Sequence, residues 1–145
     1  MVYVLDSSVE KQKFIEQLAQ KRGLKVNAFK LDSKNAIYPP VTRWLRGFMD
    51  AEYVVTDSFH GILFAILFNK PFLTFGNPRR GMTRFDSILK KMQLLDRMVC
   101  EPWGFDPELV ARDIDYSKVN AIRREEVAHS LDFLRNALAN SHEPS

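Results

Sequence analysis

The chain has 145 residues, 46% of them hydrophobic and 27% charged, which is typical of one globular domain with its own core and excludes a disordered chain. A net charge of +3 is too small to indicate nucleic-acid binding, and the single cysteine, Cys100, excludes an internal disulfide and a multi-cysteine metal site. No segment reaches the roughly 18 uninterrupted apolar residues of a membrane span, and residues 1–15 lack the features of a signal peptide, so we expect a cytoplasmic protein.

The amino-terminal part of the chain alternates short strands with helices. Residues 2–5 form an apolar run and predict a first strand, and Ser7, followed three residues later by Glu10, fits a capping box at the start of a helix. Gly23 ends that helix, and residues 24–29 predict a second strand. After a polar loop comes a helix whose apolar residues recur at spacings of three and four: Val41, Trp44, Leu45, Phe48 and Met49.

The centre of the chain has the pattern of a parallel βαβ crossover. Residues 53–55 are β-branched or aromatic and predict a buried strand, and residues 72–76 predict another. Between them lie the polar residues 56–58, which can cap a helix, and an apolar run that predicts an almost wholly buried helix near residues 60–69. In such units, ligands bind beyond the carboxyl ends of the strands, near helix amino termini. We therefore expect the working end of the chain at this polar turn.

The carboxyl-terminal part predicts a helix, a short strand and a long final helix. Gly81 permits a backbone angle that other residues resist, and a helix with an apolar face from Met82 to Met92 follows it. Residues 97–100 predict a short last strand. The final helix carries four apolar residues on one face: Val127, Leu131, Leu134 and Leu138.

Strands that alternate with helices predict an α/β fold in which a parallel sheet is covered on both faces. We count about five strands, near residues 2–5, 24–29, 53–57, 72–76 and 97–100. The expected architecture is a single Rossmann-like domain over residues 1–145.

Three motifs follow one another in the central part of the chain. They are T-D-S-F-H-G at residues 56–61, N-K-P-F at residues 69–72 and R-G-x-x-R-F at residues 80–85, within a block from about Trp44 to about Arg97. Together, and in this order, they resemble the polysaccharide pyruvyl transferase family.

The resemblance implies a transferase with two Rossmann-like domains that face each other across a cleft, as in the GT-B glycosyltransferases. This chain would be the carboxyl-terminal half, which is inactive without the missing amino-terminal domain. The implied donor is phosphoenolpyruvate, and the implied acceptor is a glycan or a lipid-linked sugar in exopolysaccharide and cell-envelope biosynthesis. In that reaction the enol-ether carbon is protonated, two sugar hydroxyls attack, and phosphate leaves, which gives a cyclic pyruvate ketal.

His60 is the leading candidate for a catalytic residue. Imidazole titrates near neutrality, so it can transfer a proton or bind an anion. A lone histidine is also typical of a helix cap or of a satisfied core position, and the residue type alone does not decide between these roles. The T-D-S-F-H-G context favours a catalytic acid or a phosphate ligand.

Ser58 and Gly61 are candidates for substrate binding at the same turn. The Ser58 hydroxyl can meet a phosphate together with the backbone amides of residues 59–61. Asp57 beside a phosphate dianion would be repulsive, so we expect it to be structural or to orient His60. Asp57 and Ser58 are equally typical of a simple N-cap.

Arg79, Arg80 and Arg84 form a basic cluster after a predicted strand, at the same edge of the sheet as His60. Guanidinium groups suit the geometry of phosphate and carboxylate. A solvated basic loop is the ordinary alternative. The R-G-x-x-R-F motif favours Arg80 and Arg84 as substrate-binding residues, with Arg79 and Gly81 in supporting roles.

No spacing of histidine, aspartate or glutamate suggests a metal site, and neither common glycine-rich nucleotide motif is present, so we expect no metal and no cofactor. Two alternative functions stay open. One is a GT-B-like half that binds a nucleotide-sugar, for which Glu101 would be the acidic residue near the ribose. The other is a non-catalytic binding domain with the same fold.

Overall fold

A parallel β-sheet lies at the centre of the protein. The structure is a computed structural model that describes residues 1–29, 39–76, 81–100 and 104–140. Within them the sheet has four strands in the order β1-β2-β3-β4, and every neighbouring pair is parallel. The strands are β1 (Val2–Tyr3), β2 (Val54–Thr56), β3 (Phe72–Phe75) and β4 (Met98–Val99). The prediction of an α/β fold with a parallel sheet is confirmed.

The segment at residues 24–29 contributes one isolated bridge, between Val2 and Ala28, in place of the predicted strand. Two backbone hydrogen bonds support it, because Val2 N donates to Asn27 O at 2.8 Å and Phe29 N donates to Val2 O at 3.0 Å. The segment is largely exposed, as its Val26 side chain shows, so it has little apolar surface with which to pack as a regular strand. The described sheet therefore has four strands, and the count of about five is not confirmed.

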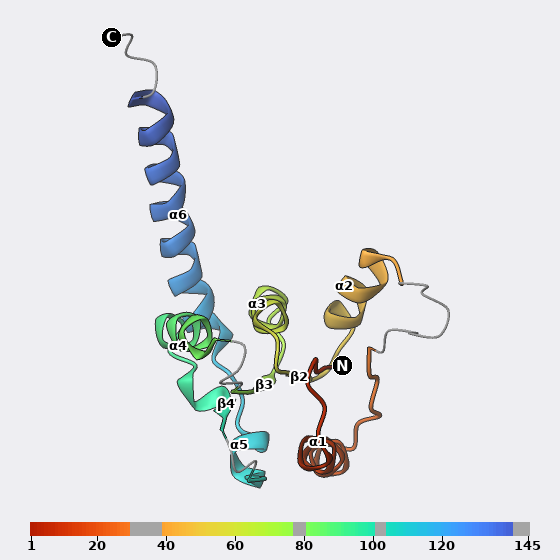
Figure 1. Ribbon diagram of the computed structural model, residues 1–145. Helices are drawn as coiled ribbons and strands as arrows, with labels where there is room; N and C mark the ends of the chain where they lie inside the picture. Colours follow the sequence, from red (N-terminus) through yellow and green to blue (C-terminus); the bar gives the residue numbers. More distant parts are fainter. Residues whose placement is uncertain (30–38, 77–80, 101–103, 141–145) are drawn as a thin grey trace.

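Helices cover both faces of the sheet, as the sequence predicted (Figure 1). The helices α1 (Val9–Arg22) and α5 (Pro107–Ala111) lie on one face, and their Phe14 and Val110 share a core cluster with Val55 and Leu73. The opposite face carries α2 (Val41–Met49), α3 (Phe59–Leu67), α4 (Met82–Lys91) and α6 (Tyr116–Asn140). A short 3-10 helix, η2 (Leu95–Arg97), leads into β4. Successive strand residues point to opposite faces, which is the alternation that a sheet with two covered faces requires.

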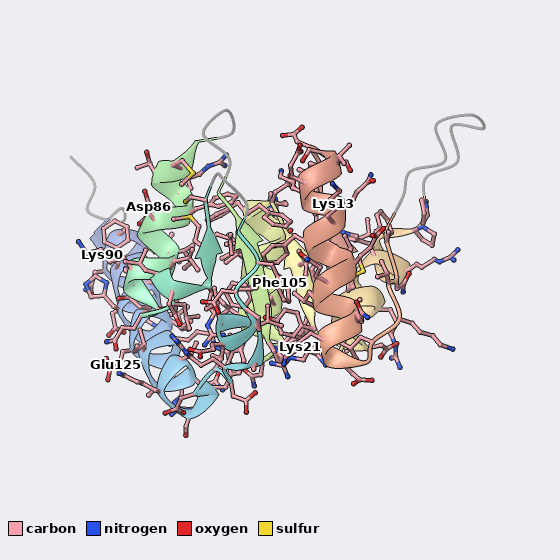
Figure 2. The ribbon with its side chains drawn as sticks, turned by 90° about the horizontal axis from the view of Figure 1, so that it is seen from below. Lys13, Lys21, Asp86, Lys90, Phe105 and Glu125 are labelled. Atoms are coloured by element: carbon pink, nitrogen blue, oxygen red, sulfur yellow. The ribbon has the colours of Figure 1, made fainter. Side chains whose placement is uncertain are left out.

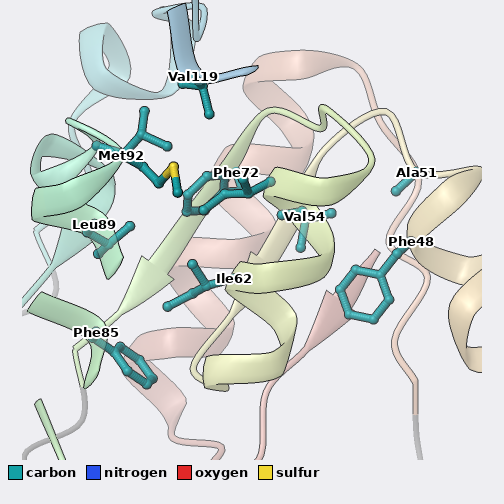
Figure 3. Packing of buried hydrophobic residues seen from close by; sticks show 12 residues of the cluster. Phe48, Ala51, Val54, Ile62, Phe72, Phe85, Leu89, Met92 and Val119 are labelled. Carbon is teal, nitrogen blue, oxygen red and sulfur yellow. The ribbon is translucent and has the colours of Figure 1, made fainter. Parts of the chain in front are cut away.

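The two core clusters are rich in aromatic side chains. On the α1 face, the Phe14 ring packs edge-on against Phe75 and Phe105, with centroid distances of 5.3 and 5.4 Å. Figure 2 shows Phe105 on this face, beside α1. On the other face, Ile62 of α3 lies among side chains from β2, β3 and α4 (Figure 3). The central crossover is therefore anchored on both sides of the sheet.

Helix α3 is buried along one side and exposed along the other. Gly61, Ile62, Ala65 and Ile66 are buried, whereas Leu67 is 49% exposed. The prediction of an almost wholly buried helix was therefore wrong for the outward face. The reason is that α2 and α4 flank α3 within a single layer, and no described element lies over its outer surface (Figure 1).

The helix ends follow local sequence signals. Gly23 ends α1 with φ of 65°, in the left-handed region that glycine adopts readily. The N-cap of α1 is Ser8, whose hydroxyl accepts a hydrogen bond from Lys11 N at 3.2 Å, so the prediction of Ser7 was wrong by one residue. Among the described helices, none is long and apolar enough to span a bilayer.

Candidate functional site

The turn from β2 into α3 is held by Thr56 and Gly61. Thr56 is fully buried, and its hydroxyl donates to Tyr3 O at 2.7 Å and accepts from Ser58 N at 3.1 Å. A Cβ at position 61 would lie 2.2 Å from Thr56 Oγ1 and 2.8 Å from Thr56 Cβ. Only glycine permits this close approach of the helix to the strand, which accounts for Gly61 by packing. Its predicted role in substrate binding stays a prediction.

Asp57 is a buried structural anchor. Its carboxylate accepts hydrogen bonds from Leu5 N at 2.6 Å, from Asp6 N at 3.0 Å and from Lys11 Nζ at 2.9 Å. These bonds fasten the end of β2 to the chain that leaves β1 and to α1. None of its hydrogen bonds to the described residues reaches His60. The geometry therefore supports the structural role expected for Asp57, and gives no support to orientation of His60.

Lys11 is a member of this arrangement that the motifs of the sequence did not predict. It is only 4% exposed, and its ammonium group also donates to Asp6 O at 2.8 Å. The side-chain exposures of the Lys11–Asp57 ion pair are 5% and 0%. A signal was available, because residue 11 falls on the same helix face as the buried Phe14, Ile15 and Leu18. A lysine in that position predicts a buried acidic partner.

His60 and Arg84 both lie against the ring of Phe59. The Arg84 guanidinium carbon is 5.4 Å from the centre of the Phe59 ring, which is the geometry of a cation–π contact. The His60 and Phe59 ring centroids are 6.2 Å apart, with an angle of 73° between the planes. His60 belongs to the first turn of α3 and Arg84 to the first turn of α4, and both side chains are exposed. Two helices thus bring a histidine and an arginine to one aromatic ring.

Phe59 itself is held by the start of α4. Its ring centroid lies 6.4 Å from that of Phe85, which is buried, so the aromatic pair fixes the distance between the two helix starts. Phe59 is half-buried. No sequence signal separated this phenylalanine from the other core aromatics, and its importance comes from its neighbours in space.

The amino end of α3 has no side-chain cap among the residues that the structure describes. Ser58 is at the N-cap position with an extended backbone, and its side chain makes no capping hydrogen bond. The amides of residues 59–61 have no partner inside the helix, as in the first turn of any α-helix. The helix dipole adds partial positive charge at this end. The Ser58 side chain is buried, at 6% exposed, whereas His60 in the same first turn is exposed.

Gly81 precedes α4 with φ of 84°, which confirms the unusual backbone angle predicted there. Arg79 and Arg80 lie outside the described residues, as does Glu101 of the nucleotide-sugar alternative. Among the residues that the structure describes, no three histidine, cysteine, aspartate or glutamate side chains are grouped so that they could hold a metal ion.

A separate cavity lies at the amino edge of the sheet. It has a volume of about 980 Å³ and is bordered by residues 23–25 and 27–29, by the end of α2 and by Tyr53. It contains none of the residues at the start of α3. This cavity and the start of α3 therefore lie at opposite edges of the sheet.

Comparison with known proteins identifies the family. The family model of the polysaccharide pyruvyl transferases matches residues 1–79, which is more than half of the 145 residues. Searches of curated proteins and of solved structures give no match. The matched region contains β1, β2, α3 and β3 with the whole T-D-S-F-H-G motif, and Arg84 follows it. The chain belongs to the polysaccharide pyruvyl transferase family.

Proposed function

We propose that this chain carries the donor-binding part of a site that transfers a pyruvyl group from phosphoenolpyruvate to a sugar of a polysaccharide or glycolipid precursor. The observation that carries the proposal is the meeting of His60 and Arg84 at the Phe59 ring, where α3 begins. A proton donor and a guanidinium group at the first residue of a helix match the needs of a reaction that protonates a phosphorylated enol.

His60 is the proposed acid. It gives its proton to the methylene carbon of phosphoenolpyruvate, and the electron pair of the enol double bond forms the new C–H bond. The adjacent carbon is left as an oxocarbenium-like centre. One sugar hydroxyl adds to this centre and loses its proton, and the bond to phosphate breaks. Breaking this bond frees the phosphate with the electron pair and leaves a second oxocarbenium-like centre. The second hydroxyl adds to this centre, which closes the ketal. The proton of the first hydroxyl returns to His60, and the proton of the second hydroxyl goes to the released phosphate.

Arg84, the Ser58 hydroxyl and the first amides of α3 are the proposed anion clamp. A charge-assisted hydrogen bond from arginine contributes roughly 1.5–3 kcal/mol. A helix amino terminus contributes roughly 0.3–1 kcal/mol when exposed. Together these terms are worth about 2–4 kcal/mol, which is roughly a 30-fold to 1,000-fold gain in affinity. Arg80, with Arg79 in support, is proposed to add to the clamp from the loop before α4.

The reaction also needs a place for the acceptor. We propose that the acceptor, a glycan or a lipid-linked sugar of the cell envelope, binds between this domain and a second Rossmann-like domain in a GT-B-like arrangement. On this proposal the chain is the carboxyl-terminal half and does not turn over alone, and the reaction is cytoplasmic. The family match supports the transferase reaction, and the two-domain arrangement rests on the family resemblance alone.

Donor specificity is tested by ligand stabilisation. Phosphoenolpyruvate should raise the melting temperature of the chain, because a ligand that binds only the folded state stabilises it. A nucleotide-sugar should leave the melting temperature unchanged. Stabilisation by the nucleotide-sugar alone would favour the glycosyltransferase alternative, and stabilisation by neither ligand would favour a non-catalytic domain.

The role of His60 is tested by turnover in the full-length protein. His60→Asn should lower kcat roughly 100-fold or more, because general acid catalysis typically contributes that much. His129→Asn is the matched control, since His129 is exposed on α6 and lies far along the chain from α3. If His60→Asn changes neither turnover nor donor affinity, His60 is not part of the site.

A further inference from the structure

Helix α6 has two halves with different surroundings. Its first half packs on the body of the protein, where Val119 is buried and Tyr116 donates a hydrogen bond to Lys70 O. Arg123 reaches Leu67 O at 3.3 Å, and Glu126 forms an ion pair with Lys91 at 2.6 Å. Beyond this point the helix projects away from the other helices and continues to its end (Figure 1).

The projecting half carries an exposed apolar surface that we name the α6 stripe. It consists of Val127, Leu131, Leu134 and Leu138, whose side chains are 52%, 45%, 53% and 68% exposed. Their spacings of four, three and four residues are those of the core positions of a coiled coil. A four-residue step back from Val127 reaches Arg123, which contacts α3. The α6 stripe therefore begins one helical turn beyond a residue by which α6 contacts its own domain.

We propose that the α6 stripe pairs antiparallel with the α6 stripe of a second copy of this chain. The spacing reads the same in both directions, so a two-fold axis matches the stripe to itself, as an isologous interface requires. Val127 then faces Leu138 of the second copy, and Leu131 faces Leu134 of the second copy. A stripe whose spacings differed when read from its two ends would not match itself across a two-fold axis.

The residues beside the α6 stripe favour the same pairing. Ala128, Ser130 and Ala137 flank it and are small, so two helices can approach closely. The side chains of residues 127–139 include one acid, Asp132, and one arginine, Arg135, and these two form an ion pair within the same helix at 3.1 Å. Two copies therefore meet without like-charge repulsion along the stripe.

The length of the projecting segment also suits an antiparallel pair. The matching puts the two-fold axis between residues 132 and 133, so residue 140 of one copy lies beside residue 125 of the other. The overlap of about 16 residues spans roughly 24 Å and ends where each helix meets its own body, close to the Lys91–Glu126 ion pair. Both projecting segments are thus covered over their whole length.

The first test is the oligomeric state. Sedimentation of the chain from about 1 to about 300 μM should show a monomer–dimer equilibrium, because a short interface of this size is typical of weak association. The variant Leu131→Ser/Leu134→Ser should weaken the dimer at least tenfold and keep the circular dichroism of the folded monomer. Phe133→Ser is the matched control: it removes another exposed apolar side chain of α6, 68% exposed but outside the stripe, and should leave the dimer unchanged.

The second test is the orientation of the helices. In a Cys100→Ser background, chains with Val127→Cys and chains with Leu138→Cys should form a disulfide when mixed, and neither should cross-link alone. Two copies of residue 127 would lie about 16 Å apart along an antiparallel pair, well beyond the roughly 7 Å limit for a disulfide. A chain that stays monomeric, a dimer that survives Leu131→Ser/Leu134→Ser, or cross-linking of each variant with itself overturns the proposal.

Discussion

Replacing Lys11 by methionine tests how the edge of the sheet beside α3 is held together. The side chain is 4% exposed and its partner Asp57 is fully buried, so the substitution leaves a carboxylate in the interior without the ammonium group that pairs with it. Methionine keeps the unbranched stem and so preserves most of the packing. The amides of Leu5 and Asp6 still donate to Asp57, but two neutral donors do not replace an ammonium group.

The expected loss of stability follows from this geometry. Breaking a buried ion pair by removal of one partner typically costs about 3–5 kcal/mol. For a domain of this size, such a loss lowers Tm by roughly 10–20 °C. The measurement is urea denaturation at neutral pH, supported by a thermal scan. Lys13→Met is the matched control on the same helix, because Lys13 is exposed (Figure 2) and the change should stay within about 0.5 kcal/mol.

A double-mutant cycle separates the ion pair from the packing of Lys11. Asp57→Asn removes the buried charge, so Lys11→Met should cost at least about 1 kcal/mol less in that background than in the original chain. Equal costs in both backgrounds would show that Lys11 acts through its stem alone. A loss below about 1 kcal/mol for Lys11→Met in the original chain would refute the view that the pair anchors this edge.

Three further predictions concern neighbouring features. Gly61→Ala should lower the free energy of unfolding in urea by about 2–4 kcal/mol, because the new Cβ would collide with Thr56. Gly47→Ala is the control and should change it by less than about 1 kcal/mol, because that Cβ meets only the flexible end of a methionine. Equal effects would contradict the packing argument. Arg84→Ala in the full-length protein should raise KM for phosphoenolpyruvate about tenfold or more with little change in kcat. The control Arg124→Ala should change neither constant. A fall in kcat alone would show that Arg84 does not bind the donor. Burial raises the pKa of Tyr53 to about 12 from an ordinary value of 10. The neutral phenol therefore contributes fully to stability below pH 10, and this contribution is lost as the pH rises towards 12. Tyr53→Phe should reduce this alkaline loss of stability in denaturation curves measured at several pH values.

Local chemistry explains what the sequence predicts well in this protein. The βαβ crossover is visible because strand and helix differ in their apolar period, and Gly23 ends α1 because glycine readily adopts the left-handed backbone. Ser8 replaced Ser7 as the cap because both residues carry the same hydroxyl, and only the packing of the whole helix fixes which one is at the boundary.

Tertiary packing explains what the sequence could not supply. Residues 24–29 have an adequate strand pattern, yet they meet β1 through a single bridge at an exposed edge of the sheet. The apolar character of α3 predicts burial on all sides, but burial also needs a neighbour, and no described element covers Leu67. Phe59 joins His60 to Arg84 through contacts between two helices, which no spacing within one helix predicts.

The T-D-S-F-H-G motif divides into residues that build the turn and residues that remain available for chemistry. Thr56, Asp57 and Gly61 are buried, and their contacts join the ends of β1 and β2 to α3. His60 is exposed at the same turn, and Phe59 is half-buried against Phe85. A change in the buried group would move the start of α3, and with it both the helix amides and the Phe59 ring, so it should impair function through position. A change in His60 should impair function without loss of stability, and this contrast distinguishes the two halves of one six-residue motif.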